Sequence, residues 1–292
     1  MNLRTFEYLM ALEQHQSFQR AADACGVSQP ALSIQIKKLE EELGAQLLER
    51  GKQTLLFTPA GQEVLARART ILLQVRDIRK MAELWQDPYT GQLSLGAFPT
   101  LAPYYFPQIT DHLVDAYPNL QFNLVEARTK ELIQQLHDGT LDGAFLALPV
   151  EDESFEYASI FSEPFYLGVP RRHPLASRET VSAAELQQER LLLLEEGHCL
   201  RGQALDYCAN AGIGEVLNFR ASSMETLLQM IAMGCAMSFV PQCVAERNPH
   251  IHYLQVEETD VSRTIALFWR KSSVRRAIML ELVDDLSRSA AP

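Results

Sequence analysis

The feature that most constrains the fold is a helix stop followed within two residues by a helix start. Gly26 ends an alanine-rich segment at residues 18–25, as a glycine does where a helix closes on a left-handed residue. Ser28 then precedes Pro30 by two positions, the pattern of an N-cap followed by a first-turn proline. Two short helices joined by such a turn predict a helix-turn-helix over residues 18–37.

Further elements frame this motif. Apolar residues at helical spacing predict a helix over 5–14, and the helix after the turn is expected to run to Leu43 and stop at Gly44. The segment 51–57 is short and β-prone and carries a cation near its start, as expected of a wing. Residues 1–58 therefore predict a winged helix-turn-helix domain.

A long helix is expected next, starting at Thr58-Pro59 and unbroken between Gly61 and Asp87. Its apolar residues alternate spacings of four and three, and they are Val64, Ala68, Ile71, Val75, Ile78, Ala82 and Trp85. A seam sustained over three heptads predicts pairing with a second copy of this helix. Packing on its own domain is the alternative. Residues 59–90 would form a linker and dimerisation helix with a hinge.

Strand-like and helix-like stretches alternate over the remaining residues, 91–292. Strands are expected at 92–98, 120–127, 142–148, 165–169, 191–196, 216–221, 237–241 and 264–270. Helices are expected at 101–116, 129–138, 200–211 and 223–233, and from about Ser273. This alternation predicts an α/β fold of two lobes with mostly parallel sheets, in which ligands bind at the carboxyl ends of the strands.

Charge is distributed unevenly along the chain. The net charge is −11, yet residues 1–87 hold 11 basic and 11 acidic side chains, whereas residues 88–292 hold 15 and 26. A neutral module can still bind DNA if its cations lie on one face.

The location of the protein is predicted by two absences in the sequence. No apolar run approaches the roughly 20 residues that span a bilayer, and the N-terminus lacks a signal-peptide pattern. A cytoplasmic protein without membrane association is therefore expected. Five cysteines, an odd number, argue against a disulfide scaffold.

Residues 21–50, AADACGVSQPALSIQIKKLEEELGAQLLER, followed by FTPAGQEVL at 57–65, resemble the LysR-type transcriptional regulators. The resemblance covers the whole chain. It implies a winged helix, a linker helix and a two-lobed effector domain like a periplasmic binding protein. It also implies a regulator rather than an enzyme, with no cofactor, metal site or catalytic residue. The expected partners are double-stranded promoter DNA, RNA polymerase and further copies of the chain in a dimer of dimers.

The second helix of the helix-turn-helix carries the expected DNA contacts. Small polar side chains in its first turn suit base edges, and Gln29 can read adenine through two hydrogen bonds. The cations Lys37, Lys38, Arg50 and Lys52 can meet phosphates. The complete set of expected DNA-binding residues is Ser28, Gln29, Pro30, Ser33, Lys37, Arg50 and Lys52, with Lys38 as a further phosphate contact. Glu40, Glu41 and Glu42 are expected to face away from DNA or toward the partner domain.

A second motif is EEGHCLRGQALDYC, residues 195–208. Cys199 follows a predicted strand at a predicted helix start, between His198 and Arg201, and all of these favour a thiolate. The sequence does not favour zinc binding, because Cys199 and Cys208 lie nine positions apart and no close ligand pair is present. The other cysteines, Cys25, Cys235 and Cys243, are assigned to structural burial.

Together with FRASSMETL at 219–227, this motif resembles the peroxide-sensing members of the LysR family. The resemblance implies that hydrogen peroxide is a partner, that Cys199 is the peroxidatic thiol and that Cys208 resolves it to a disulfide, controlling oxidative-stress genes. The implied peroxide pocket is Thr100, Thr129, His198 and Arg263. Thr100 and Thr129 each follow a strand and open a helix, so a plain N-cap role is also expected of them.

A disulfide between the two cysteines requires a change of conformation. If residues 200–208 are helical, the cysteines lie about 13 Å apart along the axis, whereas a disulfide needs Cα atoms within about 7 Å. Closing the bond therefore requires that helix to unwind, which gives a bistable element. Two alternatives to this hypothesis remain: a LysR-type regulator that binds a small anionic metabolite between the lobes, and a thiol peroxidase that only resembles a regulator.

Overall fold

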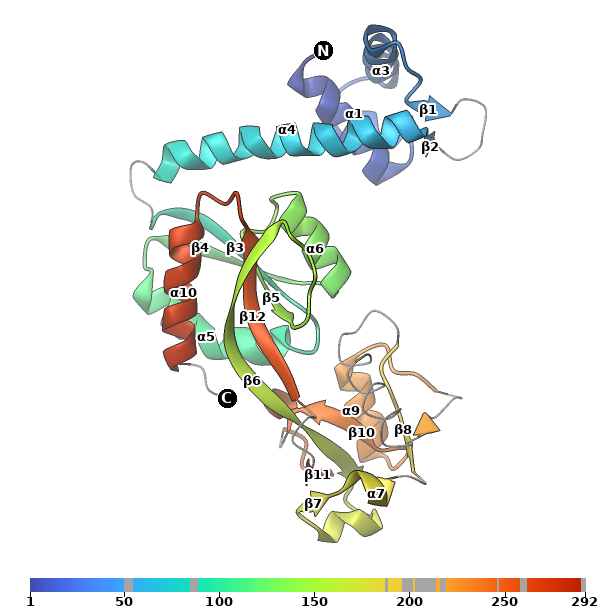
Figure 1. Ribbon diagram of the computed structural model, residues 1–292. Helices are drawn as coiled ribbons and strands as arrows, with labels where there is room; N and C mark the ends of the chain where they lie inside the picture. The colour runs from blue at the N-terminus through green and yellow to red at the C-terminus, as the bar shows by residue number, and fades with distance from the viewer. Residues whose placement is uncertain are drawn as a thin grey trace. The chain divides into compact units, whose positions relative to one another are not determined.

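The computed structural model describes residues 1–49, 55–84, 89–186, 189–195, 202, 214–215, 219–245, 247–257 and 262–289. The chain divides into two compact units, Met1–Ala82 and Glu83–Pro292 (Figure 1). Each unit has its own hydrophobic core. Within the described ranges, no helix combines the length and the apolar composition needed to cross a bilayer.

The first unit is a helical domain with a two-stranded wing. Its elements are α1 (Leu3–His15), α2 (Phe18–Ala24), α3 (Gln29–Leu43), β1 (Leu48–Glu49), β2 (Leu56–Phe57) and α4 (Pro59–Leu84). The strands β1 and β2 pair antiparallel. Leu9 and Leu12 of α1 and Leu32 and Leu39 of α3 are fully buried in one core. The predicted winged helix-turn-helix and linker helix are confirmed.

Helices α2 and α3 begin and end on capping residues. Ser17 and Ser28 precede them, and each side chain accepts a hydrogen bond at 3.4 Å from the backbone N–H three residues on. Gly26 and Gly44 follow the helices with φ of +65° and +63°, a left-handed backbone that costs glycine little. The predicted start and stop of α3 are therefore confirmed.

Helix α4 begins on a tight junction with the wing. Thr58 Oγ1 donates to the backbone oxygen of Gln46 at 2.6 Å and accepts from the Gly61 N–H at 3.0 Å. A Cβ added at Gly61 would lie 2.1 Å from the carbonyl oxygen of Leu47. Glycine is required here because the two backbones touch.

The apolar residues of α4 divide between two environments. Ala68 of the predicted seam is buried in the core of its own unit beside Leu65, which was not assigned to the seam, so Ala68 follows the alternative of packing on its own domain. Ile71 and Ile78 are 39% and 65% exposed. The other seam positions are Val64 and Val75, which are half-buried, and Ala82 and Trp85, whose side chains lie outside the described part of the chain.

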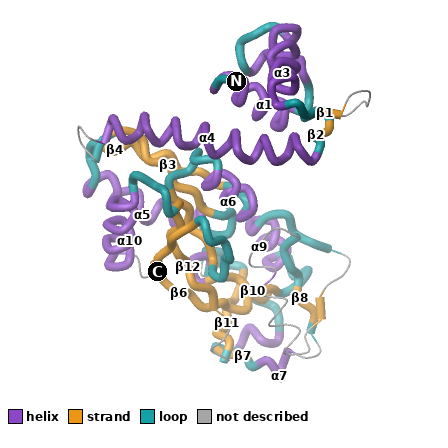
Figure 2. The backbone as a smooth tube through the Cα atoms, turned by 45° about the horizontal axis from the view of Figure 1, so that its top comes forward, coloured by secondary structure: helices purple, strands orange, loops and turns teal. Residues whose placement is uncertain are grey.

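The second unit is built on an eight-stranded sheet (Figure 2). Its strands are β3 (Gly91–Ala97), β4 (Leu120–Glu126), β5 (Gly143–Ala147), β6 (Phe155–Pro170), β7 (Thr180–Val181), β10 (Ser238–Pro241), β11 (Ile251–Val256) and β12 (Ser262–Arg270). The order is β4-β3-β5-β12-β6-β11-β7, and β10 also pairs with β6.

The expectation of mostly parallel sheets is wrong. Strand β3 runs parallel to β4 and β5, but β12 is antiparallel to both β5 and β6, and β6 is antiparallel to β10 and β11. The hydrophobic pattern of a segment can predict that it is a strand, but not whether the adjacent strand in the sheet runs parallel or antiparallel to it. Strand β6 is also 16 residues long, although only 165–169 was expected. Pro164 and the polar residues before it weaken the strand pattern.

Helices cover the sheet and complete two lobes. The helical segments are α5 (Ala102–Ala116), α6 (Thr129–His137), η1 (Pro174–Ser177), α7 (Ala183–Leu186), α9 (Met224–Ala232), η2 (Gln242–Val244) and α10 (Arg276–Ser289). The two predicted lobes are present, and each has a core of its own. Strand β6 contributes Phe155 and Ile160 to the first core and Phe165 and Leu167 to the second, and Figure 1 shows it running from one lobe into the other.

The region around the cysteine motif is described only in part. The expected strand at 191–196 is limited to β8 (Arg190–Leu191), which pairs parallel with β9 (Gly214–Glu215). Isolated bridges join Leu194 to Ala221 and Leu191 to Met237. Most of the predicted helix at 200–211 and half of the predicted strand at 216–221 lie outside the described residues.

Candidate functional site

One face of α3 is available to a partner. Ser28, Gln29 and Pro30 in its first turn are exposed and Ser33 is half-buried, whereas Leu32, Ile36 and Leu39 on the opposite face are buried. The amphipathic pattern of the helix determines this division. The expected base-reading side chains therefore lie together on the open face of α3.

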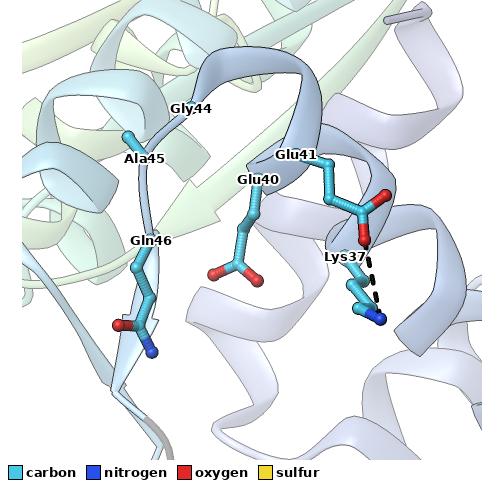
Figure 3. Close-up of a pocket in the computed structure, with 6 residues that line it drawn as sticks. All are labelled: Lys37, Glu40, Glu41, Gly44, Ala45 and Gln46. Atoms are coloured by element: carbon cyan, nitrogen blue, oxygen red, sulfur yellow. Dashed lines mark ion pairs between the residues drawn. The ribbon is translucent and has the colours of Figure 1, made fainter.

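The cations of the first unit are only partly described. Lys37 and Lys38 are exposed on α3. Lys37 Nζ lies 3.5 Å from Glu41 Oε1, one turn further along the helix (Figure 3). An exposed pair at this spacing is weak, so Lys37 can exchange Glu41 for a phosphate at little cost. Arg50 and Lys52 lie outside the described residues.

Ile34 is a residue of this face that sequence reasoning missed. Its side chain is 54% exposed on α3, one turn after Pro30. An exposed apolar side chain on a helix that enters the major groove suits the thymine methyl group. An isoleucine within an apolar pattern is normally predicted to lie in the core. The feature that indicates otherwise for Ile34 is its position outside the stripe formed by Leu32, Ile36 and Leu39.

The C-terminal end of α3 is joined to the wing by an acidic side chain. Glu40 Oε1 accepts hydrogen bonds from the N–H groups of Leu47 at 2.8 Å and Leu48 at 3.2 Å. Beside it lies a hollow of about 380 Å³, lined by Lys37, Glu40, Glu41, Gly44, Ala45 and Gln46 (Figure 3). Glu42 pairs with the N-terminal amine of Met1 at 2.5 Å. Each of these carboxylates has a partner within its own domain.

In the second unit, four buried polar residues meet where the two lobes join. Thr100 follows β3, Glu163 lies on β6, Cys243 lies in η2 and Arg263 lies on β12. No member is more than 7% exposed. We call this group the Arg263 cluster. It lies between Ile160 of the first core and Phe165 of the second along β6.

Arg263 is the centre of the cluster. Its Nε donates to Glu163 Oε1 at 2.8 Å, and Nη2 lies 2.6 Å from the same oxygen. Nη1 donates to the Thr100 hydroxyl at 3.0 Å, and Nη2 donates to the Thr100 carbonyl oxygen at 3.2 Å. The guanidinium carbon lies 5.1 Å from the centre of the Phe98 ring. A buried ion pair is tolerated because hydrogen bonds of this kind compensate for the lost hydration.

Cys243 contacts the cluster through both its backbone and its sulfur. Its N–H donates to Glu163 Oε2 at 2.8 Å, and its Sγ lies 3.6 Å from Arg263 Nη2 and 3.9 Å from the Thr100 carbonyl oxygen. Burial, with a contribution from Glu163 and opposed by Arg263, raises the pKa of the Cys243 thiol to about 12. Cys243 is therefore a protonated thiol at neutral pH and a poor nucleophile.

The other described cysteines differ from one another. Cys25 is half-buried, and burial, with Glu7 adding to it, raises the pKa of its thiol. Cys235 is exposed, so its assignment to structural burial is wrong. It follows Gly234, which has φ of +84° just beyond α9, and this turn carries Cys235 away from the core despite its apolar neighbours in sequence.

Thr100 and Thr129 do not cap helices. The N-caps of α5 and α6 are Leu101 and Arg128, and neither makes a side-chain capping bond. The Thr129 hydroxyl is buried and has no hydrogen-bond partner in the described part of the chain, and Thr100 accepts from Arg263 instead. Each threonine follows the last residue of its strand by three positions, and those last residues, Ala97 and Glu126, are paired in the sheet. The capping interpretation is therefore wrong for both.

The redox residues expected from the sequence, Cys199, Cys208 and His198, lie outside the described residues. Just before them, Glu195 pairs with Arg128 at the start of α6. The structure thus brings Thr100 and Arg263 into direct contact and places Thr129 at the same sheet edge. Sequence reasoning missed Glu163 entirely. Over the described ranges, no three His, Cys, Asp or Glu side chains are grouped to hold a metal ion.

Comparisons with known proteins agree with this architecture. The family model for the bacterial regulatory helix-turn-helix protein, lysR family, matches residues 3–62, and the model for the LysR substrate binding domain matches residues 86–291. The hydrogen peroxide-inducible genes activator of Dickeya chrysanthemi is 43% identical to this chain, over 98% of the chain and 95% of the relative.

Solved structures show the same likeness over the whole length. A full-length OxyR variant from Pseudomonas aeruginosa is 33% identical, with a TM-score of 0.76 and 99% of each chain covered. A cysteine-to-serine variant of Corynebacterium glutamicum OxyR with hydrogen peroxide bound is 30% identical, with a TM-score of 0.67, over 99% of this chain and 92% of that one. With a family model over more than half of its length and such relatives along nearly all of it, the chain belongs to the LysR family of transcriptional regulators.

Proposed function

We propose that this protein senses hydrogen peroxide through Cys199 and Cys208 and controls peroxide-inducible genes through its helix-turn-helix. The observation that carries the proposal is the pair of threonines after β3 and β4. The Thr129 hydroxyl is buried without a partner in the described residues, and the Thr100 hydroxyl accepts from a buried arginine. Two hydroxyls with unused hydrogen-bonding capacity suit a small polar ligand such as peroxide. The peroxide-inducible activator and the peroxide-bound OxyR variant support the same function.

The proposed reaction has two steps. The Cys199 thiolate attacks one oxygen of hydrogen peroxide, the O–O bond breaks, and the leaving hydroxide takes a proton to become water, with sulfenic acid left on Cys199. The Cys208 thiolate then attacks that sulfur and displaces hydroxide, which also becomes water, and a disulfide results. Thr100, Thr129 and His198 are assigned to holding the peroxide and donating hydrogen bonds to its oxygens, and Arg263 is assigned to supporting this pocket.

The test is the rate of thiol loss with hydrogen peroxide, combined with peptide mapping. Wild-type protein should form a 199–208 crosslink. Cys199→Ser should lose the response, because a hydroxyl is a far weaker nucleophile at neutral pH. Cys208→Ser should react but stop at sulfenic acid or over-oxidised forms, and His198→Ala should be oxidised more slowly. Absence of the crosslink in wild-type protein, or a normal transcriptional response in Cys199→Ser, would leave the metabolite-binding regulator in its place.

We infer that α3 reads bases with its first turn and holds phosphates with its cations. Gln29→Ala should weaken preference for the operator over random duplex by about 1–3 kcal/mol. Lys38→Ala, on the same helix, should weaken binding to both duplexes alike and flatten the salt dependence. Fluorescence anisotropy at several salt concentrations separates these outcomes, and equal losses on both duplexes for Gln29→Ala would refute its role.

We also propose that copies of the chain associate through α4, as two dimers in the complete regulator, with RNA polymerase as a further partner. The exposed Ile71 and Ile78, seven residues apart, support this pairing. Ile71→Lys should dissociate the α4 dimer and leave the second unit folded. Light scattering that still reports the native oligomer would refute the pairing. The proposed division of the chain is a DNA-binding domain at 1–58, a linker at 59–90 and a regulatory domain at 91–292.

A further inference from the structure

We propose that Glu163 is a positioning residue of the peroxide pocket. It fixes the guanidinium of Arg263 so that the Thr100 hydroxyl accepts from Arg263 and directs its own proton to a bound peroxide. The proposal rests on the proposed function, whose residues include Thr100 and Arg263 but not Glu163.

The first step is the orientation of Arg263. Glu163 and Arg263 are opposite one another in the β6–β12 ladder, and both side chains are completely buried. The two oxygens of Glu163 have different partners, since Oε1 accepts from Arg263 Nε and Oε2 accepts from the Cys243 N–H. A carboxylate held at both oxygens cannot rotate freely. The planar guanidinium bonded to it is therefore fixed in direction as well as in place.

The second step is the direction of the Thr100 proton. An arginine side chain has donors and no acceptor, whereas a hydroxyl has one donor and two acceptor sites. Arg263 Nη1 must therefore donate to Thr100 Oγ1, which leaves the hydroxyl proton for another acceptor. Among the described residues this proton has no hydrogen-bond acceptor, although Thr100 is 1% exposed. A hydroxyl that accepts from a cation also becomes a stronger donor.

The third step is what this donor does for the reaction. When the O–O bond of peroxide breaks, negative charge develops on the leaving oxygen. A donor that is already aimed at that oxygen stabilises the transition state, because it need not reorganise during the reaction. Glu163 acts on the rate only through Arg263 and Thr100. Its effect should therefore be specific to peroxide and should not extend to reagents that require no proton from the pocket.

The experiment uses the full-length reduced protein and measures two rates at Cys199, oxidation by hydrogen peroxide and alkylation by iodoacetamide. Glu163→Gln keeps the shape of the side chain, but its amide nitrogen must face either Arg263 Nε or the Cys243 N–H, which are both donors. We expect the peroxide rate to fall at least about tenfold, as for a weakened transition-state donor, and the alkylation rate to change less than about twofold.

A matched control lies on the same strand. Glu156 of β6 pairs with Arg276 at the surface, at 2.6 Å, and Glu156→Gln should leave both rates unchanged. Thr100→Val removes the hydroxyl and keeps the side-chain shape. Adding Glu163→Gln to Thr100→Val should slow peroxide oxidation by less than about twofold more, because residues that act through one group are not additive.

Several outcomes would overturn the role of Glu163. These are an unchanged peroxide rate in Glu163→Gln, an equal fall in both rates, or additive losses in the double variant. If Glu163→Gln does not fold, Glu163→Asp carries the same test, since it keeps the charge and withdraws the carboxylate by one methylene. The proposed function fails separately, when wild-type Cys199 itself does not react with peroxide.

Discussion

The exposed face of α3 and the Arg263 cluster are opposite kinds of site. The residues of α3 that are expected to meet DNA lie within one helix, and local caps at Ser28 and Gly44 fix its ends. The Arg263 cluster takes one residue from each of four segments, and Thr100 and Arg263 are 163 positions apart in sequence. The first site is assembled by neighbouring residues and the second by the topology of the sheet.

The two sites also differ in what holds their charges. The Lys37–Glu41 pair on α3 is open to solvent, with 62% of each side chain exposed, and such pairs add little to stability. The Arg263–Glu163 pair is completely buried, so removal of either partner leaves a charge without water or counter-ion. Single substitutions in the exposed pair should therefore cost little stability. In the buried cluster a substitution of one residue is costly unless its partner is replaced as well.

Removal of Arg263 should give the largest effect. Arg263→Leu leaves the Glu163 carboxylate buried without its cation, and we expect the second unit to lose about 3–5 kcal/mol of unfolding free energy. Urea unfolding measures the loss. Arg276→Leu, which breaks the surface pair with Glu156, is the matched control and should cost much less. Equal losses in the two variants would abolish the contrast between buried and exposed pairs.

The first unit also has a position that tolerates substitution poorly, although it carries no charge. Gly61→Ala places a Cβ against the Leu47 carbonyl oxygen, and overpacking of this kind should cost about 1–3 kcal/mol. Gly44→Ala meets no neighbouring atom and is strained only by its φ of +63°, so it should cost less. Thermal unfolding of the two variants tests the order, and a greater loss in Gly44→Ala would contradict it.

The smallest effect concerns thiol reactivity and should appear without any substitution. At pH 8, iodoacetamide should label the exposed Cys235 faster than the buried Cys243, whose pKa is about 12. Because that pKa is raised from 9.0, the unfolded state loses this proton first as pH rises. The contribution of this raised pKa to the free energy of unfolding is therefore fully present below pH 9, and it is lost as the pH rises to about 12. Mass spectrometry of each cysteine peptide gives the rates, and equal labelling would contradict the burial of Cys243.

The sequence was informative where structure is local. Ser28, Gly44 and Thr58 were readable as caps because the groups they satisfy lie within a few residues. Thr100 and Thr129 were misread as caps by the same reasoning, because the partner of Thr100 is Arg263 on a distant strand. Glu163 had no local signal, since it precedes Pro164 in a stretch that does not read as a strand. The assignment of Thr100 and Arg263 to one pocket came from the family resemblance and not from their spacing.

Strand β6 has a consequence for how the second unit folds and unfolds. Its 16 residues supply buried side chains to both cores, so neither lobe can come apart while the other keeps its full share of this strand. Unfolding of β6 in one lobe also removes packing from the core of the other. The two lobes, which resemble separate domains, are therefore expected to melt in one cooperative transition, with a substitution in either lobe lowering the melting temperature of both.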